Sequence, residues 1–313
     1  MQLRPVGQTG LVTAPIVFGG NVLGWTVDEA QSFRVLDAFV DHGFNAIDTA
    51  DVYSRWAPGH IGGESETILG RWLKARPGMR DRVTIFTKVG SDMGAPGEKG
   101  LSARWIAKAV EASLRRLGTD VIDLYFAHWP DAETPQEDTL AAFGALKQAG
   151  KIRAIGASNL NAQQLGQALA LSDNGLPAYQ VLQPEYNLYA RDSFEGPLRD
   201  LCIARGLGVV SYFALASGFL TGKYRGPQDL GQSVRGEDIG DYFTPRGFAL
   251  LDALDRVAKA HNATPAEVAL AWVMAQPGIT APIASATKPA HVDSFARAAA
   301  LRLTAEDMAV LNL

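Results

Sequence analysis

The sequence has a single cysteine, Cys202, among its 313 residues, so no disulfide can form within the chain. It also lacks an excess of basic residues: the formal net charge is −4, which gives no support to nucleic acid or an anionic membrane as a partner. No apolar run approaches the length of a membrane span, and the first residues lack the pattern of a signal peptide. These absences predict a cytoplasmic, globular protein.

Two common cofactor motifs are missing as well. The first expected strand is followed by the segment 19–24, whose glycines do not have the Gly-x-Gly-x-x-Gly spacing of a doubly wound dinucleotide-binding sheet. The segment 217–224 has three residues between its glycines where a P-loop has four, and Tyr224 stands where Ser or Thr would bind magnesium. No His, Cys or carboxylate pair has metal-ligand spacing, so we expect no metal site.

What the sequence does contain is an alternation of short apolar runs and longer amphipathic segments, repeated eight times. Several apolar runs are nearly continuous, which is typical of parallel strands covered on both faces. Strands are expected at 16–20, 44–49, 83–89, 122–128, 153–157, 180–183, 208–213 and 281–285. Helices are expected at 28–42, 65–75, 102–117, 137–149, 161–172, 192–205, 247–262 and 289–300. This order predicts an α/β fold, a (β/α)8 TIM barrel in a single domain spanning 1–313.

Further elements are expected around the barrel. Residues 2–13 can form a short N-terminal β-hairpin, and Thr264 opens a capping box that begins an extra C-terminal helix. Another short helix is expected from Thr304. The loops 90–100 and 225–246 follow the third and seventh strands, so both should lie at the C-terminal face, where barrel enzymes build their active sites.

Polar side chains at the ends of the strands are the candidates for chemistry. Asp48 and Tyr53 follow the second strand, Lys88 the third and His128 the fourth, and a charge after an apolar run is costly unless it is paired. We therefore expect these four residues to face one another. A phenol has an ordinary pKa of about 10, and a neighbouring ammonium would lower it. Tyr53 could then give a proton to an oxygen, with Asp48 holding Lys88 and His128 orienting a carbonyl.

Six segments, taken together and in this order, make the sequence resemble the aldo-keto reductase family from about residue 3 to about residue 300. The resemblance implies the four catalytic residues named above and a nicotinamide cofactor bound without a Rossmann fold. The segments are IDTADVY (47–53), FTKVG (86–90), DLYFAHWPD (123–131), GKIRAIGASN (150–159), QPEYN (183–187) and SGFLTGKY (217–224).

The resemblance also implies where the cofactor lies. Ser158, Asn159 and Gln183 are expected to hold the nicotinamide carboxamide, and Tyr212 is expected to stack on the ring. The pyrophosphate is expected along the main chain of 213–220, with Lys223 adding positive charge. The residues of that segment assigned to the cofactor are Phe213, Leu215, Gly218 and Leu220.

At the adenosine end the sequence departs from the family. The arginine that many members carry is absent from 283–295, so only Lys288, with Ser285, Thr287 and His291, remains to meet a 2′-phosphate. We expect NADP(H) to be preferred moderately, because a lysine is a point charge without the fork of arginine. NAD(H) is the alternative cofactor.

The expected reaction is hydride transfer between NADP(H) and a small carbonyl compound, an aldehyde or a ketone. Trp25, Trp56 and Trp129 lie in loops after strands and are expected to line the substrate pocket, which suits a planar, cyclic or moderately apolar substrate. The sequence names neither that substrate nor the oligomeric state. Two alternatives stay open: a cofactor-sensing regulatory subunit of a membrane channel, and a sugar or alcohol dehydrogenase that works in the oxidative direction. The lack of an N-terminal interaction segment favours an enzyme.

Overall fold

The computed structural model describes the chain over all 313 residues, except for the side chains of Glu237 and Asp238. Eight parallel strands close into a barrel in the order β10-β3-β4-β5-β6-β7-β8-β9. The strands are β3 (Val17–Gly19), β4 (Ala46–Asp48), β5 (Thr84–Val89), β6 (Ile122–Ala127), β7 (Ile152–Ser158), β8 (Val181–Gln183), β9 (Gly208–Ser211) and β10 (Ala281–Ala284). Each coincides with an expected strand to within a few residues, and the predicted (β/α)8 barrel is confirmed.

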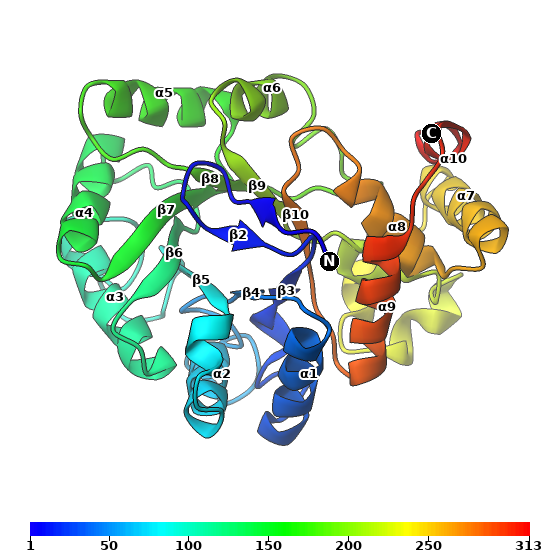
Figure 1. Cartoon of the computed structure of the whole chain (residues 1–313), viewed down its shortest axis with the longest axis horizontal. Helices are drawn as coiled ribbons and strands as arrows, with labels where there is room; N and C mark the ends of the chain where they lie inside the picture. The colour runs from blue at the N-terminus through cyan, green and yellow to red at the C-terminus, as the bar shows by residue number, and fades with distance from the viewer.

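Helices surround the barrel, as Figure 1 shows. They are α1 (Glu29–Asp41), α2 (Glu64–Ala75), α3 (Ala103–Leu117), α4 (Gln136–Gln148), α5 (Ala162–Asp173), α6 (Pro197–Ala204), α7 (Pro245–His261), α8 (Pro265–Met274), α9 (Pro289–Ala300) and α10 (Ala305–Leu311). Helix α6 begins five residues later than expected. Its preceding residue, Gly196, has a φ of 85°, and Pro197 takes the first helical position. The capping boxes at Thr264 and Thr304 are both formed.

The predicted N-terminal hairpin is present and closes one end of the barrel. Strands β1 (Arg4–Pro5) and β2 (Val12–Thr13) pair in antiparallel fashion, and Figure 1 shows this blue hairpin lying across the barrel opening. Val6, in the turn of the hairpin, is completely buried among the interior side chains of the barrel. The opposite end, at the C-terminal edges of the strands, is therefore the end available to ligands.

The barrel interior explains how the polar side chains come together. Side chains alternate along a strand, so every second residue points into the barrel. Phe86 of β5 belongs to the apolar interior, which consists of Val6, Val17, Ala46, Phe86, Leu124, Phe126, Ala154, Val181, Val210, Ala281 and Ile283. Two residues beyond Phe86 comes Lys88. The same step of two beyond an interior residue on β4, β6 and β8 reaches the other side chains at this level, Asp48, His128 and Gln183.

Candidate active site

A completely buried lysine joins two of the predicted catalytic residues. Lys88 Nζ donates to Asp48 Oδ2 at 2.6 Å, to Tyr53 OH at 2.8 Å and to the carbonyl oxygen of Thr49 at 2.8 Å. The three acceptors match the three donors of an ammonium group. This geometry fixes the ammonium beside the phenol, and all three of its hydrogens are used in these bonds.

Asp48 is held from the other side as well. Gln183 Nε2 donates to Asp48 Oδ1 at 2.9 Å, and Tyr53 OH donates to Asp48 Oδ2 at 3.4 Å. Burial raises the pKa of Asp48, although the neighbouring Lys88 acts in the opposite direction. Burial likewise lowers the pKa of Lys88, against the effect of Asp48. The pair is therefore costly to keep charged, and its hydrogen bonds offset that cost.

The expected effect of Lys88 on the tyrosine is not what the structure gives. Burial, followed by the charge of Asp48, raises the pKa of Tyr53 well above its ordinary value, although the charge of Arg235 acts in the opposite direction. The sequence-based prediction considered the ammonium alone, whereas the phenol is enclosed and lies against a carboxylate. Tyr53 accordingly keeps its proton throughout the neutral pH range.

His128 lies edge-to-face with Tyr53, with ring centroids 6.0 Å apart. Burial, and then the charge of Lys88, lowers the pKa of His128 well below its ordinary value, so the imidazole is neutral at pH 7. Its Nδ1 lies 3.0 Å from Ser91 Oγ. All four residues that the sequence placed in one group are thus brought together at the C-terminal end of the barrel.

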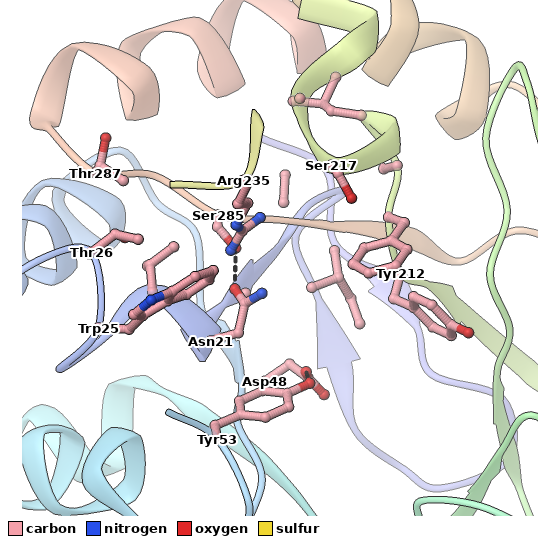
Figure 2. Close-up of a pocket in the computed structure, with 18 of the residues that line it drawn as sticks. Asn21, Trp25, Thr26, Asp48, Tyr53, Tyr212, Ser217, Arg235, Ser285 and Thr287 are labelled. Atoms are coloured by element: carbon pink, nitrogen blue, oxygen red, sulfur yellow. Dashed lines mark hydrogen bonds between the residues drawn. The ribbon is translucent and has the colours of Figure 1, made fainter. Parts of the chain in front are cut away.

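Three of these residues, Asp48, Tyr53 and His128, line one end of a cavity of about 1020 Å³, and Lys88 lies buried behind them. Figure 2 shows Asp48 and Tyr53 at this end and Thr287 at another, with Asn21 and Ser285 in between. Both predicted loops contribute to the lining, through Ser91 and residues 232–235. The cavity therefore runs from the tetrad of Asp48, Tyr53, Lys88 and His128 to the segment after β10.

Most of the residues expected to contact the cofactor line this cavity. Near the tetrad they are hydrogen-bonded to one another: Tyr212 OH donates to Asn159 Oδ1 at 2.7 Å, and Asn159 Nδ2 donates to Ser158 Oγ at 3.1 Å. Ser158 Oγ in turn donates to the carbonyl oxygen of Gln183 at 2.7 Å. The expected residues in the lining are Ser158, Asn159, Gln183, Tyr212, Phe213, Leu215, Gly218, Lys223, Ser285, Thr287 and His291.

Two of the expected residues do not line the cavity. Leu220 is completely buried in the apolar layer between the barrel and its helices, so its side chain is part of the core. Lys288 precedes α9 as its N-cap residue and is exposed. His291 lines the cavity, but burial, followed by the charges of Lys288 and Lys223, lowers its pKa, so it adds no positive charge at neutral pH.

The segment after β9 has an unusual backbone. Phe213, Ala216 and Ser217 have φ values of 54°, 47° and 55°, in the left-handed region that non-glycine residues rarely adopt. Asn187 Nδ2 donates to the carbonyl oxygen of Phe213 at 3.0 Å and helps to hold this conformation. Backbone strain of this kind clusters at functional sites.

Sequence reasoning missed a cation in the cavity. Arg235 comes from the loop 225–246 and lines the cavity, with its guanidinium carbon 5.0 Å from the centre of the Trp25 ring. The glycine-rich loop was correctly placed at the C-terminal face, but nothing in its sequence distinguishes Arg235 from Arg225. Asn21 was also missed: it accepts a hydrogen bond from Ser285 Oγ at 2.7 Å across the cavity (Figure 2).

All three tryptophans expected at the substrate pocket line the cavity beside the tetrad. Trp25 and Trp56 meet edge-to-face with ring centroids 5.4 Å apart, and Trp56 meets Tyr53 in the same way at 5.9 Å. Trp129 stacks on His128 at 5.6 Å. Aromatic surfaces therefore flank the phenol and the imidazole, where a substrate carbonyl would be placed.

Other kinds of site find no support in the part of the chain whose side chains are described. No group of three or more His, Cys, Asp or Glu residues there could hold a metal ion. Among the described residues, no helix is long and apolar enough to cross a membrane. Cys202 is buried, and burial raises the pKa of its thiol to about 12, which makes it unreactive at neutral pH.

Comparison with known proteins identifies the family of this chain. The model of the aldo/keto reductase family matches residues 15–312. The chain belongs to this family. It is 32% identical over 322 residues to aldo-keto reductase YhdN of Bacillus subtilis (strain 168), which covers 100% of this chain and 93% of the relative. It is 32% identical over 324 residues to aldo-keto reductase str7 of Strobilurus tenacellus, covering 99% and 90%.

A third relative is described as a channel subunit and not as a reductase. A protein of Arabidopsis thaliana described as a probable voltage-gated potassium channel subunit beta is 31% identical over 310 residues, covering 95% of this chain and 91% of the relative.

The family resemblance that the six segments indicated is confirmed. The protein is an oxidoreductase of the aldo/keto reductase family. Members of this family act on small carbonyl compounds and generally use a nicotinamide cofactor.

Proposed function

We propose that this aldo/keto reductase reduces aldehydes or ketones with NADPH, using Tyr53 as the proton donor. One observation carries the proposal: a fully buried ammonium, Lys88 Nζ, lies 2.8 Å from the phenol oxygen of Tyr53 and 2.6 Å from Asp48, at the end of a large cavity. Buried ionisable groups with perturbed pKa values in a cavity are typical of functional sites.

The residues along the cavity fit a nicotinamide dinucleotide. When bound, the cofactor supplies the hydride. The amide groups of Asn159 and Gln183 can pair with a carboxamide, and the ring of Tyr212 offers an aromatic face next to them. Lys223 and Arg235 are cations in the lining, suited to a pyrophosphate.

Each of the four residues of the tetrad has its own role in this reaction. Tyr53 holds a proton at its phenol oxygen, since its raised pKa keeps it protonated at neutral pH. Lys88 donates to that oxygen and stabilises it as the proton leaves, while Asp48 keeps the ammonium in place. His128 is neutral and can donate a hydrogen bond to the carbonyl oxygen. In the oxidative direction the same phenol oxygen would take the proton back as a base.

The preference for NADPH has support at the far end of the cavity. The charges of both Lys288 and Lys223 lower the pKa of His291, so both act at this point of the lining. A 2′-phosphate near His291 would be stabilised by both lysines. Because Lys288 is exposed and lies outside the lining, its contribution is screened by solvent and the preference is moderate.

The test is oxidation of NADPH and of NADH against a panel of aldehydes and ketones. We expect turnover with aromatic or cyclic carbonyls, faster with NADPH, and its loss in Tyr53→Phe with the affinity for NADPH retained. Turnover equal to that of wild type in Tyr53→Phe would refute the catalytic assignment. Tighter binding of NADH than of NADPH would refute the cofactor assignment alone.

A second function has one supporting observation, the relative described as a potassium channel subunit beta. A regulatory subunit would bind the cofactor while turnover mattered little. It would be supported by negligible NADPH consumption across the carbonyl panel together with stable, stoichiometric association with a membrane channel protein. Ready turnover of any carbonyl by the purified chain favours the enzyme.

A further inference from the structure

Ser91 is a residue of the site to which the tetrad chemistry assigns no role. It follows β5 by two residues, is partly buried and lines the cavity. Its Oγ lies 3.0 Å from His128 Nδ1, which is a normal hydrogen-bond distance. It is the one side chain hydrogen-bonded to the imidazole among the side chains that the structure describes.

The rest of His128 is firmly held. Its main-chain N–H donates to the carbonyl oxygen of Val89 at 2.8 Å, and its own carbonyl oxygen accepts from Asn159 Nδ2 at 2.9 Å. The ring stacks on Trp129 with an interplanar angle of 16°. With the ring plane fixed and Nδ1 occupied by Ser91, Nε2 is the nitrogen left for a ligand in the cavity.

The identity of the Nδ1 partner decides what Nε2 can do. A neutral imidazole carries one hydrogen, on either Nδ1 or Nε2. The usual Nδ1 partners, a carboxylate or a main-chain carbonyl, only accept, so they place the hydrogen on Nδ1 and leave Nε2 bare. A bare Nε2 could not donate to a carbonyl oxygen. The hydroxyl of Ser91 differs because it can donate into Nδ1.

We propose that Ser91 is a positioning residue, which donates its hydroxyl hydrogen to Nδ1 of His128 and so keeps the imidazole hydrogen on Nε2, available to the substrate carbonyl. This inference rests on the proposed carbonyl reduction, in which His128 donates to the carbonyl oxygen. The neutrality of the imidazole, caused by its burial and by Lys88, agrees with it.

The first test observes the tautomer without any turnover. Nitrogen-15 NMR of the histidine-labelled free protein distinguishes a ring nitrogen that bears hydrogen from one that does not, and His128→Gln assigns the signals. We expect hydrogen on Nε2 in wild type and in Ser91→Thr, which keeps the hydroxyl. In Ser91→Ala the two tautomers should mix. Hydrogen on Nδ1 in wild type would overturn the proposal.

The second test is kinetic. In Ser91→Ala we expect kcat for carbonyl reduction to fall by about 2- to 13-fold, the range that one net neutral hydrogen bond is worth, with KM for NADPH unchanged. Ser91→Thr should restore most of the loss. The matched control is Ser193→Ala, which removes an exposed serine hydroxyl bonded to the carbonyl oxygen of Glu185, and it should behave as wild type.

The outcomes separate this inference from the function on which it rests. If Ser91→Ala keeps both the kcat and the imidazole signals of wild type while His128→Gln is inactive, the role of Ser91 is refuted and carbonyl reduction stands. If His128→Gln reduces carbonyls as wild type does, the part of His128 in the proposed function is refuted, and Ser91 loses its role with it.

Discussion

Replacing Lys88 by methionine tests the central ion pair, because the side chain keeps its length but loses its charge and its three donors. Asp48 would retain the hydrogen bonds from Gln183 and Tyr53 but would be a buried carboxylate without a cation, and the carbonyl oxygen of Thr49 would lose its donor. Removing one partner of a buried pair costs about 3–5 kcal/mol. We expect a loss of unfolding free energy in that range at about pH 8, and the loss of most turnover.

The pH dependence of this loss has a definite sign. Burial already raises the pKa of Asp48 in the folded protein, and removing Lys88 removes the main influence that lowers it. A carboxyl group whose folded pKa is raised contributes its stability fully below the unfolded pKa of about 4 and loses it as the pH rises through the folded value. The loss of unfolding free energy caused by Lys88→Met should therefore be smaller at about pH 5 than at about pH 8.

Urea unfolding followed by tryptophan fluorescence measures these differences. The double variant Lys88→Met/Asp48→Asn removes the uncompensated carboxylate, so it should recover part of the stability at pH 8 and show little pH dependence of its deficit. It should stay as inactive as the single variant. A single variant whose deficit is independent of pH, or a double variant that is no more stable than it, would refute the reasoning that Asp48 is the source of the cost.

Three further results are expected. Tyr53→Phe should lower kcat by about 10²–10⁴-fold with the Kd for NADPH unchanged, and a kcat above half of wild type would contradict the role of the phenol. Lys288→Ala and Lys223→Ala should each narrow the affinity gap between NADPH and NADH in a tryptophan-quenching titration, and the effect at the exposed Lys288 should shrink with salt. Asp51 is buried, and burial, followed by the charge of Glu66, raises its pKa well above the ordinary value, so its stability contribution is lost as pH rises. Asp51→Asn should therefore raise the unfolding free energy by about 1–3 kcal/mol at pH 8, and by less at pH 5, in urea titrations; a destabilised variant would show that the ionised carboxylate is needed.

The barrel and its tetrad were accessible from the sequence because they depend on local patterns. Buried parallel strands are nearly continuous apolar runs, so the strand that ends at Asp48 could be recognised from its own residues, without knowing which strands pair with it. Once eight such strands are assigned, closure of the barrel brings their C-terminal ends together, so Lys88 and His128 had to lie near one another. Helix α6 shows the limit of this reasoning. Its apolar pattern extends before Pro197, but the backbone at Gly196 is not helical, so the helix begins only at Pro197.

The conformation of the loops, and so the contacts of many of their residues, could not be predicted by such patterns. Arg235 reaches Trp25 across the cavity, and the two residues are 210 positions apart in a sequence that gives no sign of the contact. Lys288 was assigned to a cofactor phosphate by its place in the segment 283–295, and the sequence could not show that it precedes α9 as an exposed residue outside the cavity lining. The conformation of a loop depends on what it packs against, which a single sequence does not contain.

The pKa of Tyr53 shows most clearly what three-dimensional placement adds. The residue types alone suggested that Lys88 would lower it, but its direction depends on two opposing charges and on the exclusion of water, and these are set by distances of a few ångströms. With Asp48 and burial included, the phenol stays protonated at neutral pH. In the proposed reaction Tyr53 is the proton donor, and the protonated phenol is the form that carbonyl reduction needs.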